Sequence, residues 1–399
     1  MNILVVNCGS SSIKFQLLDM ETEKLLVKGS VEKIGTRSAI LNLDIPGKDK
    51  IKNVFEILDH QTALEKVVQS LMCKDLGIIK DKSDIKAVGH RVVHGGESYS
   101  DAVLIDNAVL TEIRNLIDLA PLHNPHNIKG IEVCQRLFPD VPQIAVFDTA
   151  FHQTMPPESY IYPLPYVLYK RYKIRRYGFH GTSHYFVAQK CAEIMGKPYD
   201  QLNIITAHLG NGCSITAIKK GRVIDTSMGF TPLEGLVMGT RCGDIDTSII
   251  TFVIAKEELS LQEANTLLNK HSGLMGISGV SNDMKDLTEA SASDPRAKLA
   301  IDIFAYRLKK YIGAYAAALG GIDALVFTGG IGENCALVRE ISSEGMEYMG
   351  IKFDKDKNAQ SRGLAELSKP DSKVKVFCIP TNEELVIARE TKRIVGDKK

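Results

Sequence analysis

Two polar motifs near the start of the 399-residue chain place cations beside loops. Residues 7–14 read Asn-Cys-Gly-Ser-Ser-Ser-Ile-Lys, and backbone N–H groups, hydroxyls and Lys14 could hold phosphate oxygens there. The Walker A pattern is absent, and a plain hairpin turn is the alternative. Arg91 lies inside an apolar strand, where either an anionic ligand or a structural carboxylate must pair with it. The glycines at 95 and 96 favour the ligand.

Histidines and an aspartate mark three further motifs. His123 lies in residues 120–127 (APLHNPHN), which predict a rigid polar loop that binds a substrate oxygen or satisfies its own polar groups. Metal binding is disfavoured there because no third ligand has obvious spacing. Asp148 follows an apolar strand, where α/β folds place site groups, although a turn cap is the alternative. His180 precedes a glycine in a polar stretch, which favours a site histidine over a satisfied turn histidine.

Residues 226–246 are rich in glycine, threonine and serine, which predicts a long irregular segment with a functional role. Arg241 near its end could join Arg91 in clamping a charged substrate. The alternative is that Asp244 and Asp246 pair with Arg241 as structural salt bridges.

Two late motifs complete the set. Residues 323–334 predict a strand that runs into a glycine turn, but the dinucleotide pattern G-x-G-x-x-G does not fit. A close backbone approach to a nucleotide base suits this segment better, with a plain turn as the alternative. Residues 381–384 (TNEE) are typical of helix caps, although one carboxylate could instead hold a metal.

The elements that position these motifs follow an α/β pattern. A succession of strand, glycine turn, strand, turn and strand occurs near residues 2–31 and again near 203–225, which predicts a duplicated architecture with mixed sheets. We expect helices at 61–72, 108–119, 295–319 and 383–395, and further strands at 144–147, 324–327 and 373–379. The best domain boundary lies just after Asp148.

Composition narrows the class of protein. Lys and Arg number 49 against 48 Asp and Glu, so no polyanion-binding surface is indicated, and a chain of this length suits two domains. Eight scattered cysteines predict free thiols and disfavour zinc. The start lacks the pattern of a secretory signal, and no apolar run approaches the roughly 20 residues of a membrane span. The expected compartment is the cytoplasm.

Taken together, the motifs resemble the acetate kinase family, within the superfamily of actin, sugar kinases and heat-shock chaperones, over nearly the whole length. The matching segments are residues 7–14, 89–96, 120–127, 147–152, 177–184, 207–212, 225–246, 327–334 and 381–384. The resemblance implies duplicated actin-like (ribonuclease H-like) α/β domains with mixed sheets flanked by helices. Domain one would be 1–150 joined by helix 385–399, domain two the nucleotide-binding 151–384, and the enzyme a homodimer.

The implied activity is Mg²⁺-dependent, reversible in-line phosphoryl transfer from ATP to acetate, giving acetyl phosphate and ADP. Mn²⁺ is a possible substitute metal. A propionate- or butyrate-preferring kinase is the alternative substrate class, and a non-catalytic actin-like scaffold that only binds nucleotide is the alternative outside enzymes. No nucleic acid or membrane partner is expected. The acceptor carboxylate is ionised at neutral pH and needs no general base.

The resemblance also implies roles for individual residues, which we give as expectations. Catalytic residues would be Arg91, His123, Asp148, His180 and Arg241, and Arg91, Val93, Leu122, Phe179 and Pro232 would bind the acyl substrate. Asn7 and Glu384, together with Asp148, would surround the magnesium. The nucleotide would contact Lys14, His208, Leu209, Gly210, Asn211, Gly212, Asp283, Met284, Lys285, Ile331, Gly332, Glu333, Asn334 and Cys335. Two positions depart from the family pattern, Lys285 in place of arginine and Thr247 in place of proline.

Overall fold

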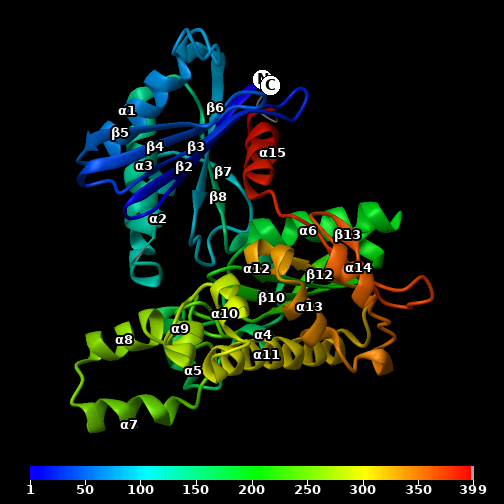
Figure 1. Ribbon diagram of the computed structural model, residues 1–399. Helices are drawn as coiled ribbons and strands as arrows, with labels where there is room; N and C mark the ends of the chain where they lie inside the picture. The colour runs from blue at the N-terminus through cyan, green and yellow to red at the C-terminus, as the bar shows by residue number, and fades with distance from the viewer. Residues whose placement is uncertain (122, 397–399) are drawn as a thin grey trace. The chain divides into compact units, whose positions relative to one another are not determined.

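The chain forms two compact units in the computed structural model, which describes residues 1–121 and 123–396 (Figure 1). Unit 1 comprises Met1–Ala150 and Asn382–Lys399, and unit 2 comprises Phe151–Thr381. The chain first passes between units after Ala150, close to the boundary expected after Asp148. It returns after Thr381, slightly before the expected residue 384, because the last helix begins at Glu383.

Unit 1 contains an eight-stranded mixed sheet in the order β5-β4-β3-β2-β1-β6-β8-β7. Four helices accompany it, and the last of them, α15, follows the return from unit 2 (Figure 1). The strands are β1 Asn2–Cys8, β2 Ser12–Asp19, β3 Lys24–Glu32, β4 Thr36–Asp44, β5 Ile51–Ile57, β6 Ile85–Val92, β7 Val103–Leu104 and β8 Gln143–Phe147. The helices are α1 His60–Leu71, α2 Asn107–Asn115, α3 Asn124–Leu137 and α15 Glu383–Gly396.

Unit 2 contains a six-stranded mixed sheet in the order β11-β10-β9-β12-β14-β13. Its strands are β9 Asn203–Leu209, β10 Cys213–Lys219, β11 Arg222–Thr226, β12 Ala324–Thr328, β13 Ala365–Glu366 and β14 Lys375–Cys378. Its helices are α4 Pro157–Tyr160, α5 Tyr166–Tyr172, α6 Gly181–Met195, α7 Thr247–Glu257, α8 Leu261–Lys270, α9 Gly273–Ser278, α10 Met284–Ala290, α11 Pro295–Leu319, α12 Gly329–Asn334, α13 Ala336–Ser343 and α14 Lys355–Gln360.

The predicted duplication is confirmed by the strand pairing. In unit 1, β3, β2 and β1 pair antiparallel, and β6 and β8 then continue the sheet parallel to β1. In unit 2, β11, β10 and β9 pair antiparallel, and β12 and β14 continue parallel to β9. Both units therefore repeat the same five-strand arrangement, and each presents strand ends where polar loops begin.

The C-terminal helix α15 packs directly on the sheet of unit 1. Ile387 and Ala388 are buried in one cluster with Ile3 of β1 and Ile144 of β8. A Cβ atom on Gly89 of β6 would lie 2.4 Å from the Thr391 hydroxyl, so glycine is needed for this close approach. This packing fixes the first turn of α15 at the edge where β1, β6 and β8 end.

Two sequence predictions need correction. The helix expected at 108–119 stops at Asn115 and is followed by a 3₁₀ turn at Ile117–Leu119. The second half of the polar loop expected at 120–127 is instead the first turn of α3, which starts at Asn124, and Pro125 is tolerated there because the N–H groups of that turn have no intrahelical partner to lose. By contrast, α11 begins and ends as predicted, between the Asp294 cap and Gly320.

Two further findings concern the described part of the chain. The cysteines there are free thiols, as the scattered spacing predicts. None of the helices in residues 1–121 and 123–396 combines the length and apolar character that crossing a bilayer requires.

Candidate active site

Arg91 lies near the end of β6 and pairs with a carboxylate just beyond the neighbouring strand β8. Its Nη2 donates to Asp148 Oδ2 at 2.8 Å, and its Nε lies 3.9 Å from Glu383 Oε2 on α15. Asp148 is almost fully buried, and its backbone N–H donates to the Val92 carbonyl. Burial by itself lowers the pKa of Arg91, but Asp148 and Glu383 outweigh it and raise that pKa. Arg91 therefore has the structural carboxylate partner that the sequence analysis gave as the alternative to an anionic ligand.

The first turn of α15 brings two more carboxylates to the same edge. Asn382, not a carboxylate, caps the helix by accepting from the Leu385 N–H at 3.1 Å. Burial and the neighbouring Glu383 raise the pKa of Glu384, while Lys14 and Arg91 oppose that rise. Because these couplings fade with distance, they indicate that Glu384 faces the same polar region as Lys14 and Arg91.

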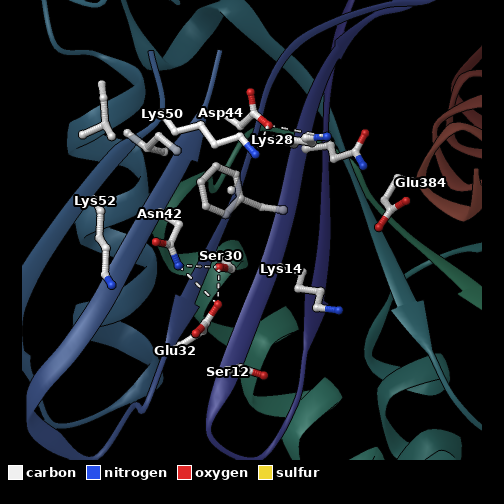
Figure 2. A pocket seen from close by; sticks show the side chains of 15 residues that line it. Ser12, Lys14, Lys28, Ser30, Glu32, Asn42, Asp44, Lys50, Lys52 and Glu384 are labelled. Atoms are coloured by element: carbon white, nitrogen blue, oxygen red, sulfur yellow. Dashed lines mark hydrogen bonds and ion pairs between the residues drawn. The ribbon is translucent and has the colours of Figure 1, made fainter. Parts of the chain in front are cut away.

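Asn7 and Lys14 are direct cross-strand partners on β1 and β2. Lys14 is exposed, and it lines one pocket of unit 1 together with Glu384 (Figure 2). The same pocket has three more lysines, two of which are paired with Asp44 at 3.6 and 3.7 Å. Lys14 is the pocket lysine nearest in sequence to the serine loop, and its exposed side chain can reach a ligand.

Two asparagines in the first turn of α3 join three elements of unit 1. Asn127 accepts from the Val93 N–H at 3.0 Å and donates to the Cys8 carbonyl at 2.9 Å. Asn124 exchanges hydrogen bonds of 3.2 Å with the backbone of His94. The sequence analysis placed Leu122 and His123 of this motif in the site. The buried asparagines were missed as positioning groups, although asparagines that open a helix are themselves a signal.

His180 in unit 2 adopts a left-handed conformation, with φ of 58°, immediately before α6. Its Nδ1 is 2.8 Å from the Ser214 hydroxyl, and that hydroxyl also contacts His184 Nε2 at 2.7 Å. The His180 ring stacks on His208 with centroids 4.3 Å apart. His208 in turn bonds Ser183, so the ring that the sequence assigned to the nucleotide supports His180.

Arg241 lies in the irregular segment that follows β11, as the sequence predicts. Its Nη1 donates to the Pro232 carbonyl at 3.0 Å and contacts Met238 sulfur at 3.7 Å. Within the described residues it has no carboxylate partner, and Asp244 instead binds Arg307 and Tyr311. Burial lowers the pKa of Arg241. A partly buried guanidinium paired only with neutral groups would be stabilised by an anionic ligand.

A single glycine shows how close Arg241 and His180 lie to the turn after β9. A Cβ atom on Gly212 would be 3.4 Å from Arg241 Nη1 and 3.5 Å from His180 Cε1. In the same turn, Asn211 accepts from Asn282 at 3.1 Å. The turn therefore connects the cationic groups to the segment that precedes α10.

One pocket of unit 2 unites three of the segments that the sequence assigned to the nucleotide, whereas Lys14 lines the pocket of unit 1. Its lining includes Gly210 and Asn211 after β9, Asp283, Met284 and Lys285 at the start of α10, and Ile331, Asn334 and Cys335 on α12. The sequence analysis missed Asn282, Thr288, Glu289, Gly330, Ala336 and Leu337, which also line it. Thr288 and Glu289 lie three and four positions after Lys285, so helical spacing could have identified them.

Comparisons with known proteins identify the family of the chain. Residues 2–389 match the model of the acetokinase family. The chain belongs to the acetokinase family. An acetate kinase of Caldanaerobacter subterraneus subsp. tengcongensis is 55% identical over 397 residues, which cover 99% of each chain.

Two solved structures extend the likeness to the fold. The crystal structure of Porphyromonas gingivalis acetate kinase has a TM-score of 0.95 at 47% identity and covers 99% of both chains. That of a propionate kinase from Francisella tularensis has a TM-score of 0.92 at 45% identity, covering 98% of this chain and 99% of the other. The predictions of the family, its fold and a kinase activity are confirmed.

Several predicted residues of this acetokinase have mainly structural contacts. Glu333 accepts from the Gly329 and Thr381 N–H groups at 3.0 and 3.2 Å, and Gly332 is buried. Among the residues expected to hold the acyl group, Val93 is buried in unit 1, and Phe179 and Pro232 lie in unit 2. Leu122 lies outside the described residues.

Proposed function

We propose that this acetokinase transfers the γ-phosphoryl group of ATP to acetate, reversibly and in a single in-line step, giving acetyl phosphate and ADP. The observation that carries the proposal is the place of Arg241 in unit 2. It lies beside His180, has neutral partners only among the described residues, and adjoins the glycine turn that lines the pocket. A protein that only bound nucleotide would have no use for this second anion site.

The two arginines are assigned to the carboxylate and the transferring phosphoryl group. Arg91 belongs to unit 1 and Arg241 to unit 2, and a planar guanidinium binds two oxygens of either anion at once. Asp148 and Glu383 keep Arg91 charged and limit its rotamers. In the transfer, an acetate oxygen forms a bond to the γ-phosphorus while the bond to the bridging oxygen of ADP breaks.

His180 is assigned to the charge that develops on the moving phosphoryl oxygens. Its Nδ1 is 2.8 Å from the Ser214 hydroxyl, and we assign the other ring nitrogen, Nε2, to a phosphoryl oxygen. The His208 ring and the left-handed backbone hold the imidazole in one orientation. We assign His123, before α3, an assisting role in unit 1.

The acidic residues of unit 1 fit a magnesium ion. Asn7, Asp148 and Glu384 offer oxygen ligands only, and Mg²⁺ prefers one or two carboxylates supplemented by phosphates and water. The raised pKa of Glu384 is the mark of a buried carboxylate that a cation would stabilise. The described residues contain no cluster of three or more His, Cys, Asp or Glu that could hold a metal ion. When bound, Mg²⁺ neutralises charge on the phosphates.

The nucleotide is assigned to the pocket of unit 2, and the two units to the two actin-like domains of the family. Lys285 contributes charge at this pocket but not the planar stacking surface of an arginine. We further propose a cytoplasmic homodimer that binds neither nucleic acid nor membrane. Exposed apolar side chains on α5 and α7, including Val167 and Phe252, support the association of two copies.

Acetate is preferred over longer acids in this proposal because the named relatives at 52–55% identity are acetate kinases. The likeness to a propionate kinase keeps propionate as the second candidate. One methylene in an apolar pocket discriminates by only about 1–3 kcal/mol, so activity with both acids is expected.

The test is Mg-ATP turnover with acetate, propionate and butyrate in parallel, trapping acyl phosphate with hydroxylamine. Fastest hydroxamate formation with acetate supports the proposal, and fastest formation with a longer acid changes the assigned substrate. Nucleotide binding without hydroxamate from any acid would favour the scaffold.

A further inference from the structure

The segment that carries Arg241 has neither helix nor strand between β11 and α7, yet it must hold a guanidinium in place. The alternative of salt bridges from Asp244 and Asp246 does not hold Arg241, because Asp244 binds elsewhere and Asp246 caps α7. The side chains that fix this segment come instead from the chain between α4 and α6. They are Arg176 and Tyr162, neither of which has a role in the proposed chemistry.

The guanidinium of Arg176 contacts several groups at the start of the segment that carries Arg241. Its Nη1 lies 2.8, 3.1 and 3.4 Å from the carbonyl oxygens of Thr226, Ser227 and Met228. Its Nη2 donates to Glu234 Oε1 at 2.6 Å. The same side chain therefore contacts both ends of residues 226–234, a stretch that we call the bend.

Tyr162 closes the bend from the other side. Its hydroxyl donates to Glu234 Oε2 and accepts from the Phe230 N–H at 2.9 Å. A Cβ atom on Gly229 would lie 1.7 Å from Glu234 Oε2 and 2.1 Å from the Tyr162 oxygen. The residue at 229 must therefore be glycine for the tyrosine, the glutamate and the backbone to converge.

The bend that these contacts define presents the carbonyl of Pro232, which accepts from Arg241 Nη1 at 3.0 Å. A second hydrogen bond connects two parts of the same segment, since the Gly235 N–H donates to Asp244 Oδ1 at 2.8 Å. The path from Arg176 to the Arg241 guanidinium thus passes through Glu234, the single intervening residue Leu233 and the carbonyl of Pro232, with a hydrogen bond at each end. Arg176 and Glu234 have side chains 16% and 31% exposed, so bulk water screens their pairing only in part.

We propose that Arg176, with Glu234 and Tyr162, is a positioning residue that sets the place of the Arg241 guanidinium during phosphoryl transfer. The inference rests on the proposed function, because it assigns Arg241 to the reacting anions. Displacing a positioned group by about 1 Å can cost about 10²-fold in rate. Lysine at 176 retains the charge opposite Glu234 but cannot reach three carbonyls and a carboxylate at once.

The test compares Arg176→Lys and Tyr162→Phe with wild-type protein in the hydroxamate assay, and Arg296→Lys serves as the matched control. Arg296 also donates to backbone carbonyls, those of Ile277 and Gly276, but not in this segment. For Arg176→Lys we expect kcat to fall about 10²-fold with the KM for ATP within about twofold of wild type. Tyr162→Phe removes one hydroxyl and is expected to lower kcat about tenfold, and the control to stay within about twofold.

A double-mutant cycle separates positioning from general loosening of the fold. If Arg176 acts through Arg241, adding Arg176→Lys to an Arg241→Lys variant lowers kcat much less than it does in wild type. An undiminished effect in that background, or an equal rise in the KM for ATP, would overturn the inference. Should Arg176→Lys fail to fold, Tyr162→Phe takes its place in the cycle, and the same two results would support or overturn the positioning role. Wild-type protein without hydroxamate would overturn the proposed function itself, whereas an active wild type with unchanged variants would overturn only the positioning role.

Discussion

At the scale of single residues, the structure assigns each of the two proposed anion-binding arginines a different electrostatic setting. Arg91 has carboxylate neighbours in Asp148 and Glu383, so it can remain charged without a ligand. Arg241 contacts only a carbonyl and a thioether among the described residues, so an incoming anion would be its first full counter-charge. The first arginine therefore has a structural role as well, and the second keeps the charge that the proposed function assigns to an anion.

Replacing Arg91 by alanine tests this difference. The change leaves Asp148, which is 1% exposed, without its cation, and breaking one partner of such a pair costs about 3–5 kcal/mol. We expect loss of acyl phosphate formation together with a reduced free energy of unfolding in urea. Arg389→Ala is the control, because the Arg389–Glu23 pair is about half exposed and worth about 0–1 kcal/mol. Equal stability of the two variants would contradict the assignment.

The neighbouring His90 gives a pH prediction. Burial lowers its pKa from 6.5 to about 4, despite the Gln143 contact at 2.8 Å. Between these values the unfolded chain binds a proton that the folded protein excludes, so stability falls as pH drops through that window. At pH 5 the loss relative to pH 7 is about 2 kcal/mol. A His90→Gln variant should lose less between pH 7 and 5 in urea unfolding, and an identical loss would count against the prediction.

At the scale of elements, the unit 1 half of the site depends on how α3 meets two strand ends. Asn127 bonds the carbonyl at the end of β1 and the N–H just beyond β6. Close packing completes the joint, since a Cβ atom on Gly130 of α3 would lie 2.3 Å from the Cys8 sulfur. Asn7 and Arg91 therefore share one support although 84 positions separate them in the chain.

Truncating this support should affect both stability and turnover. Asn127→Ala leaves the Val93 N–H and the Cys8 carbonyl unpaired in a buried place, at about 1–3 kcal/mol for each group. We expect a lower urea midpoint and slower hydroxamate formation. Asn115, which is exposed at the end of α2, gives a control with changes below about 0.5 kcal/mol on Asn115→Ala. An Asn127→Ala variant with wild-type midpoint and rate would refute the role.

At the scale of the whole molecule, two helices of unit 2 expose large apolar side chains. Tyr166, Val167 and Tyr172 of α5 and Ile249 and Phe252 of α7 are all about half exposed or more. Where such side chains gather into a contiguous patch, the patch marks a site of association. They are the physical basis for expecting a finite dimer instead of a monomer.

Sedimentation at several concentrations checks this expectation. Wild-type protein should sediment as a dimer, and Phe252→Glu, which places a charge on a side chain now 62% exposed, should shift it toward monomer. Tyr348→Glu serves as the control, because Tyr348 is 80% exposed and belongs to neither α5 nor α7. A monomeric wild type, or open polymers as an actin-like scaffold would form, would contradict the dimer.

The sequence by itself determined the repeated strand pattern, the limits of α11 and the order of the polar motifs, because local periodicity, caps and glycine turns act within a few residues. It also identified Arg91, His180 and Arg241 as candidates. Only the tertiary structure decided what they touch, since Asp148 lies 57 positions from its partner Arg91. The buried links through Asn127 and Arg176 likewise depend on chain segments that meet only after folding. Hydrogen bonds between such distant residues produce no periodic pattern in a sequence, so they can be identified only in the tertiary structure.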